Sequence, residues 1–120
     1  MGIARPLLAA LIAAAVLAGC NGAPAAASRD VWRQQIAEQK AAIANDPHDI
    51  AARVKLARAQ IRLGDGIGAE ATVRAALAAG GKGDYLRPLL ARAYALQGDG
   101  TRAFETLDGG PIAPDMIGEA

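Results

Sequence analysis

A duplicated segment in the second half of the chain constrains its fold more than any other feature. The segment Leu56–Ala69 reads LARAQIRLGDGIGA, and the segment Leu90–Ala103 reads LARAYALQGDGTRA. Eight of the fourteen aligned positions are identical, and each matched pair is separated by 34 residues (90 − 56). A repeat of this period is typical of stacked helix–turn–helix units, because each unit needs a neighbour to bury its apolar face. The duplication therefore predicts an all-α fold.

Turn-forming residues divide the rest of the chain into five predicted helices. Proline and glycine interrupt helices, so Pro47 and Gly64 mark two of the boundaries. An aspartate or serine just before a helix can cap its first amide groups, as Asp49 and Ser28 would. The expected helices cover residues 30–44, 49–63, 68–79, 85–97 and 101–107.

Residues 1–19 have the pattern of a lipoprotein signal peptide. A positively charged start precedes an apolar run, Leu7–Ala18, which is short for a helix that must span about 30 Å of hydrocarbon. The run ends in Leu17-Ala18-Gly19-Cys20, which resembles the bacterial lipobox. The resemblance implies cleavage before Cys20 and acylation of its thiol, and two or more acyl chains would anchor the chain stably. The alternative is a structural helix with an incidental cysteine.

The residues after the cysteine indicate where the chain resides and how it is organised. Asn21 stands where an aspartate often marks inner-membrane retention in enteric bacteria, and this analogy favours the periplasmic face of the outer membrane. Residues 20–28 are mostly alanine, glycine and proline without charge, which is typical of a flexible tether. A repeat domain over residues 29–108 and a disordered tail over residues 109–120 complete the predicted organisation.

Composition excludes several classes of function. Residues 1–19 contain one charged side chain, Arg5, so the rest of the chain has twelve basic and twelve acidic residues and a net charge of 0 (12 − 12). A neutral chain gives no electrostatic basis for nucleic-acid binding. One cysteine and one histidine, His48, cannot form an internal disulfide or a zinc cluster, and no nucleophile–base pair is found. The sequence therefore predicts no enzyme, cofactor or metal site.

The duplicated segments resemble the tetratricopeptide repeat. Leucines, small residues and glycines recur where this family uses them for helix packing and for the turn between its two helices. The matching positions are Leu56, Leu90, Ala57, Ala91, Tyr94, Gly64, Gly98, Ala69, Ala103, Ala76 and Pro47. The departures from the family pattern are Arg53, Arg87, Gln60 and Gly81. The resemblance covers roughly residues 42–107 and implies an antiparallel helix–turn–helix solenoid of about two and a half repeats.

A narrower resemblance concerns the whole arrangement of lipobox, tether and repeats. It is similar to the N-terminal part of the tetratricopeptide lipoproteins of exopolysaccharide and PEP-CTERM sorting systems, and Arg87–Tyr94 carries most of the likeness. The resemblance implies a membrane-anchored scaffold that binds a protein or peptide in exopolysaccharide export or PEP-CTERM sorting. Two alternatives stay open. One is a chaperone-like accessory of outer-membrane assembly, and the other is a truncated, nonfunctional fragment of a longer repeat lipoprotein.

Arginines at equivalent repeat positions are the candidates for partner binding. Arg58 and Arg92 are matched in the duplication, and Arg62 lies one helical turn after Arg58. In the tetratricopeptide family these positions line the concave groove that binds extended peptides, and Tyr85 would offer a flat apolar contact nearby. A guanidinium can hold a carboxylate through two parallel hydrogen bonds. The alternative is a solvated helix face whose charges contribute little.

Overall fold

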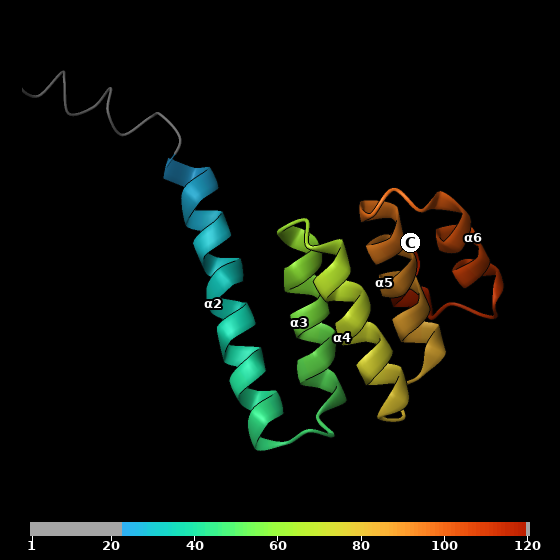
Figure 1. Ribbon diagram of the computed structural model, residues 1–120, viewed down its shortest axis with the longest axis horizontal. Helices are drawn as coiled ribbons and strands as arrows, with labels where there is room; N and C mark the ends of the chain where they lie inside the picture. The colour runs from blue at the N-terminus through green and yellow to red at the C-terminus, as the bar shows by residue number, and fades with distance from the viewer. Residues whose placement is uncertain (1–22, 120) are drawn as a thin grey trace, which may run out of the picture. The chain divides into compact units, whose positions relative to one another are not determined.

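The computed structural model describes residues 23–119, and within this range the chain forms helices and no strand (Figure 1). The elements are α2 (Ala23–Asn45), α3 (Ile50–Arg62), α4 (Gly66–Ala78), α5 (Gly83–Leu96), α6 (Gly100–Asp108) and the 3-10 helix η1 (Pro114–Glu119). The predicted all-α class is confirmed. The chain divides into two units, Met1–Asp30 and Val31–Ala120, and the packing described below belongs to the second. The lipobox residues and Cys20 lie outside the described residues.

The duplicated Gly-Asp-Gly motif ends one helix and starts the next in both hairpins. Gly64 and Gly98 have φ angles of 79° and 78°, a left-handed conformation that glycine adopts without steric cost at the end of a helix. The carboxylates of Asp65 and Asp99 then accept a backbone N–H of the following helix at 2.8 and 3.0 Å. Asp49 caps α3 in the same way at 2.9 Å. The two turns and the Asp49 cap therefore form where the sequence predicts them. The caps at Asp65 and Asp99 were not predicted, and with them α4 and α6 begin two residues and one residue earlier than expected.

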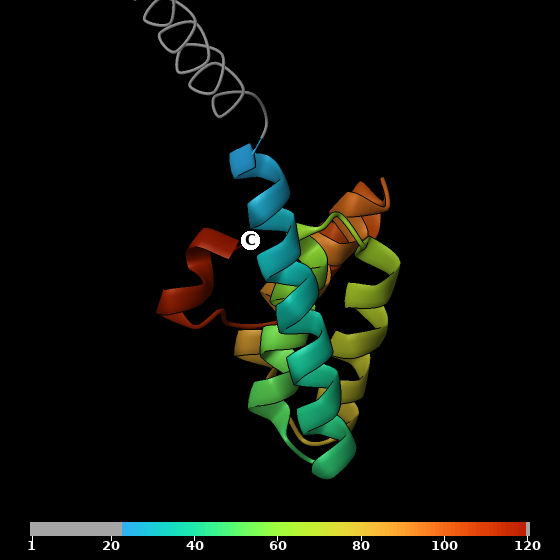
Figure 2. The same ribbon diagram turned by 90° about the vertical axis from the view of Figure 1, so that its left-hand side faces the viewer.

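Helices α3, α4, α5 and α6 each pack against the next, and α3 also packs against α5 (Figures 1 and 2). Small residues at the contacts allow the backbones to approach closely, and Ala59, Ala69 and Ala76 have no exposed surface. Larger apolar side chains fill the space between them. The hydrophobic cluster consists of Ala57, Ile61, Ala69, Val73, Ala76, Leu86, Leu89, Leu90, Ala93, Tyr94, Ala113 and Met116.

A buried polar pair joins α3 to α4. Gln60 is one of the departures from the tetratricopeptide pattern, where an aromatic residue is usual, and its side chain is buried. The hydroxyl of Thr72, also buried, donates to Gln60 Oε1 at 2.7 Å. A buried amide without a partner would cost about 1–3 kcal/mol. The Thr72 hydroxyl therefore makes a glutamine acceptable at this core position.

Helix α2 begins earlier than the sequence predicts. Its first residue is Ala23, so residues 23–28, expected to be part of a flexible tether, are helical. Ser28 consequently lies inside the helix and does not cap it. Alanine has the highest helix propensity of all residues, and a proline is tolerated in the first turn, where Pro24 stands. The alanine-rich composition therefore favours helix here.

The C-terminal segment differs from the disordered tail expected for residues 109–120. It returns from α6 to pack against α5 and ends in η1, shown in red in Figure 2. Met116 has no exposed surface and Ala113 is 6% exposed, and both belong to the hydrophobic cluster. Two apolar side chains of the segment are therefore buried in a core that includes a helix distant in sequence.

Candidate functional site

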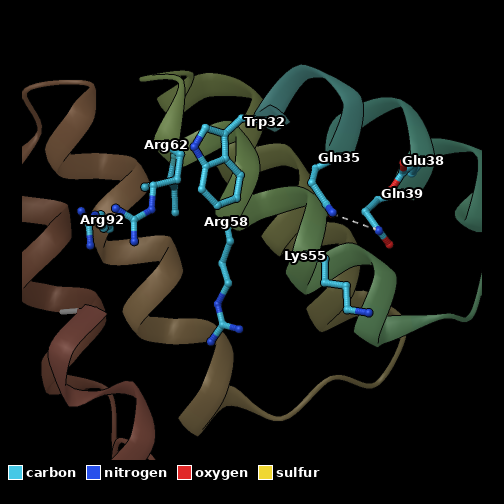
Figure 3. Close-up of a pocket in the computed structure, with 9 residues that line it drawn as sticks. Trp32, Gln35, Glu38, Gln39, Lys55, Arg58, Arg62 and Arg92 are labelled. Carbon is cyan, nitrogen blue, oxygen red and sulfur yellow. Dashed lines mark hydrogen bonds between the residues drawn. The ribbon is translucent and has the colours of Figure 1, made fainter. Parts of the chain in front are cut away.

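An open pocket of about 640 Å³ lies between α2, α3 and α5, within the unit Val31–Ala120 (Figure 3). Its lining consists of Trp32, Gln35, Glu38 and Gln39 from α2, of Lys55, Arg58, Ile61 and Arg62 from α3, and of Arg92 from α5. Ligand pockets commonly have volumes of roughly 300–1,000 Å³. The pocket therefore has room for several side chains of a bound peptide.

Helical spacing brings the lining residues onto the pocket. Lys55, Arg58 and Arg62 are three and four residues apart in turn, so their side chains share one face of α3. The lining residues of α2 follow the same spacing from Trp32 onward. Arg92 is the counterpart of Arg58 in the second repeat and reaches the pocket from α5. Two regular helix faces and one side chain of a third helix thus define the site.

The pocket is basic. Its lining contains four cationic side chains, Lys55, Arg58, Arg62 and Arg92, and one carboxylate, Glu38, for a formal charge of +3 (4 − 1). All four cationic residues are exposed. Like charges gathered in a concave surface repel one another and attract anions, because the walls concentrate the electric field. The pocket therefore favours an anionic ligand.

Trp32 gives the pocket a flat aromatic wall. The guanidinium carbon of Arg62 lies 5.8 Å from the centroid of the Trp32 ring, which is within the range of a cation–π contact. Figure 3 shows the ring beside the Arg62 side chain. Trp32 is the single tryptophan of the sequence. Its fluorescence can therefore report on ligands that enter the pocket.

The structure brings three of the four predicted groove residues together. Arg58, Arg62 and Arg92 line the same pocket. Tyr85 does not line it; this residue lies at the start of α5 and is 41% exposed. Lys55 was not predicted from the sequence, although its spacing from Arg58 is a usable signal. Trp32 was not predicted either, because the approach of this ring to α3 depends on the placement of α2 and leaves no periodic pattern.

Comparison with protein-family models, with curated proteins and with solved structures found no match for this chain. Among the helices of residues 23–119, none combines the length and the hydrophobicity that crossing a bilayer requires. In the same part of the chain, no group of three or more His, Cys, Asp and Glu side chains is arranged to hold a metal ion. The geometry and charge of the pocket are therefore the basis for assigning a function.

Proposed function

We propose that this chain is a lipid-anchored, tetratricopeptide-like interaction module of a bacterial envelope, and that its basic pocket binds an extended acidic segment of a partner protein. The convergence of Arg58, Arg62 and Arg92 beside Trp32 is the observation that carries the proposal. The packing of α3 with α4, and of both with α5, supports a stack of two-helix repeats. The lipobox resemblance at Cys20 supports the membrane anchor. No catalytic role is part of the proposal.

An acidic peptide matches the chemistry of the cationic, amide and aromatic groups in the pocket. An arginine can bind a carboxylate through two parallel hydrogen bonds, and Lys55 would add a point charge. The side-chain amides of Gln35 and Gln39 can donate to and accept from a peptide backbone. At present Gln39 Nε2 donates to Gln35 Oε1 at 3.4 Å, a long bond that a ligand could replace. Trp32 would pack against an apolar side chain of the ligand.

Titration of the full chain with a tetraglutamate peptide, followed through Trp32 fluorescence, tests the pocket. An exposed ion pair contributes roughly 0.2–1 kcal/mol. The double variant Arg58→Ala, Arg92→Ala should therefore bind the peptide about two- to thirty-fold more weakly than the wild type. Its helical circular dichroism should be unchanged, because both side chains are exposed. Added salt should weaken wild-type binding, since exposed charges are screened.

The matched control removes the same charge from another part of the surface. Lys40 and Lys82 are exposed and do not line the pocket, so Lys40→Ala, Lys82→Ala should bind tetraglutamate as the wild type does. An equal loss in both double variants, or no response of Trp32 fluorescence to the peptide, would contradict the proposal. Salt-insensitive binding of an uncharged apolar peptide would favour the alternative role as a chaperone-like accessory of outer-membrane assembly.

The anchor is tested separately at Cys20. The variant Cys20→Ser lacks the thiol that would be acylated, so both acylation and cleavage should fail, and the uncleaved precursor should accumulate. Treatment with globomycin should have the same effect on the wild-type chain. The lipoprotein assignment would be wrong if the serine variant were processed and fractionated with the membrane normally.

We place the module in exopolysaccharide export or PEP-CTERM sorting because of the resemblance carried by Arg87–Tyr94. A strain that lacks the chain should then secrete less exopolysaccharide or missort proteins with the PEP-CTERM signal. Complementation with the variant Arg58→Ala, Arg92→Ala should restore less function than complementation with the wild type. Normal secretion and sorting in the deletion strain would oppose this setting without affecting the pocket itself.

A further inference from the structure

The C-terminal segment attaches to the body of the protein through an apolar pair. Met116 is fully buried and Ala113 is 6% exposed, and both side chains enter the hydrophobic cluster. Around them Pro114, Asp115 and Ile117 are exposed. The segment therefore presents two apolar residues, three positions apart, to the helices and its remaining side chains to solvent.

Pro88 creates a backbone acceptor for this segment on α5. In an uninterrupted helix the N–H of residue 88 would bond to the carbonyl oxygen of Asp84, but a proline has no N–H. That carbonyl oxygen accepts the backbone N–H of Ala113 instead, at 3.1 Å. Nearby, the Arg87 side chain donates to the carbonyl oxygen of Pro111. Helix α5 thus forms main-chain and side-chain hydrogen bonds with the chain segment that packs against it.

A third contact joins the C-terminal segment to a residue that also lines the basic pocket. Arg58 lines the pocket, and its Nη2 also donates to Met116 Sδ, with 3.1 Å between nitrogen and sulfur. A thioether sulfur is a weak acceptor, whereas a carboxylate is a strong, ionised acceptor for a guanidinium. A carboxylate that binds Arg58 through Nη2 would therefore compete with Met116 for this nitrogen.

The composition of the segment, and of the glycine pair that joins it to α6, is suited to reversible attachment to α5. Residues 109–120 contain Asp115 and Glu119 and no lysine or arginine, so the segment is acidic like the ligand that the pocket favours. Gly109 and Gly110 connect it to α6, and Gly110 has a φ of 150°, a conformation open to glycine. A glycine pair changes conformation at low steric cost. The segment could therefore leave α5 without disturbing α6.

We infer that residues 111–117 are a tethered occupant of a peptide-binding subsite on α5, and that an acidic partner segment displaces them. The subsite comprises the Asp84 carbonyl oxygen, the Arg58 guanidinium and the apolar surface that buries Ala113 and Met116. It accepts a short segment with a small residue followed, three positions later, by a long unbranched apolar residue. Displacement by an acidic segment rests on the proposed function, whereas the subsite itself does not.

Binding of the segment in trans tests the subsite. In the wild-type full chain, a fluorescein-labelled peptide of residues 111–120 must compete with a tethered copy whose effective concentration is roughly millimolar. Met116→Ala weakens the tethered copy. Fluorescence anisotropy should therefore show the peptide binding this variant roughly tenfold or more tightly than the wild type. Ile117→Ala is the matched control; Ile117 is 65% exposed, and its variant should bind like the wild type.

Pro88→Ala tests the backbone acceptor. Alanine supplies an N–H at residue 88 that bonds to the Asp84 carbonyl oxygen within α5 and so withdraws this acceptor from Ala113. We expect the double variant Pro88→Ala, Met116→Ala to keep its helical circular dichroism. It should bind the labelled peptide several-fold more weakly than Met116→Ala alone. Equal binding by the two variants would show that this hydrogen bond plays no part in the subsite.

Three outcomes separate this inference from the proposed function. If Met116→Ala unfolds the chain, or binds the labelled peptide no better than the wild type, the segment is a fixed part of the core and the inference is wrong. Tetraglutamate added to the complex should release the peptide and lower its anisotropy. If the peptide stays bound while Trp32 fluorescence responds to tetraglutamate, the pocket function stands and displacement is refuted.

Discussion

The hairpins α3–α4 and α5–α6 share a duplicated segment, but they are buried to different extents. In α4, Ala69, Val73 and Ala76 have no exposed surface. In α6, which the structure describes completely, no residue is buried, and Phe104 is 73% exposed. The difference arises because α4 packs between α3 and α5, whereas α6 packs against α5. The sequence of a repeat therefore determines its turn and its helices, and its neighbours determine how much of it becomes core.

The largest difference in the free energy of unfolding is expected between truncation of a buried side chain and truncation of an exposed side chain of the second hairpin. Leu89 in α5 has no exposed surface, and Leu89→Ala should lower the free energy of unfolding by about 2–5 kcal/mol. Phe104→Ala in α6 should change it by less than about 0.5 kcal/mol. Urea denaturation followed by circular dichroism measures both. A large loss for Phe104→Ala would mean that the outer face of α6 is covered in solution.

Alanine in place of the glycines that begin α4 and α6 should change the stability of the chain in opposite directions. A Cβ at Gly66 would lie 2.8 Å from the carbonyl oxygen of Ala93 and 2.9 Å from Leu96 Cβ, whereas a Cβ at Gly100 would meet nothing within 4 Å. Gly66→Ala should therefore destabilise the chain by about 1–3 kcal/mol. Gly100→Ala should be neutral or stabilise it by about 0.4–1 kcal/mol. Similar urea midpoints for the two variants would contradict the close approach of α4 to α5.

Removing the aspartate cap of α4 and removing that of α6 should lower stability by similar amounts. Asp65 and Asp99 accept equivalent backbone hydrogen bonds at 2.8 and 3.0 Å, so replacing either by alanine should cost about 0.5–2 kcal/mol. Asp99 also forms an ion pair with Arg102 at 3.4 Å, but an exposed pair adds little. Urea midpoints that fall by similar amounts would show that the turn is a local property. A much larger loss at Asp65 would mean that packing also depends on this cap.

Local signals explain what the sequence predicted correctly. Helix α3 begins directly after Asp49 and ends at Arg62, one residue before the expected Leu63, because capping and turn chemistry act between close neighbours. Arg58 and Arg92 reach one pocket because matched repeat positions lie on α3 and α5, which pack together. The duplication therefore allowed the helices of the two hairpins and the central part of the candidate site to be predicted.

Contacts between distant residues explain what the sequence did not reveal. The burial of Met116 depends on α5, and no periodic pattern among the surrounding glycines and prolines indicates it. The contact of Trp32 with Arg62 depends on the placement of α2. The absence of an N–H at Pro88 is visible in the sequence. The residue whose N–H bonds to the Asp84 carbonyl oxygen instead is not. These features require the arrangement of the helices in space.

Glu70 in α4 links the first hairpin to the end of α5, and the residue 34 positions later, just beyond the duplicated segment, is the exposed Phe104 of α6. Gln97 Nε2 donates to one carboxylate oxygen of Glu70 at 2.9 Å, and Arg74 Nε donates to the other at 2.9 Å. These hydrogen bonds, that of Gln97 first, lower the pKa of Glu70 below its usual value of 4.5. The second hairpin has phenylalanine at this position and makes no corresponding charged contact there.

The smallest effect is expected from Glu70→Gln, and it should depend on pH. Because the folded-state pKa of Glu70 is lowered, its stabilisation is complete at neutral pH and is lost as the pH falls through the folded-state value. Glu70→Gln should therefore lower the urea midpoint slightly at neutral pH and leave it unchanged in acid well below that value. Phe104→Gln should change neither midpoint. An equal loss for Glu70→Gln at both pH values would show that the link to Gln97 does not depend on the carboxylate charge.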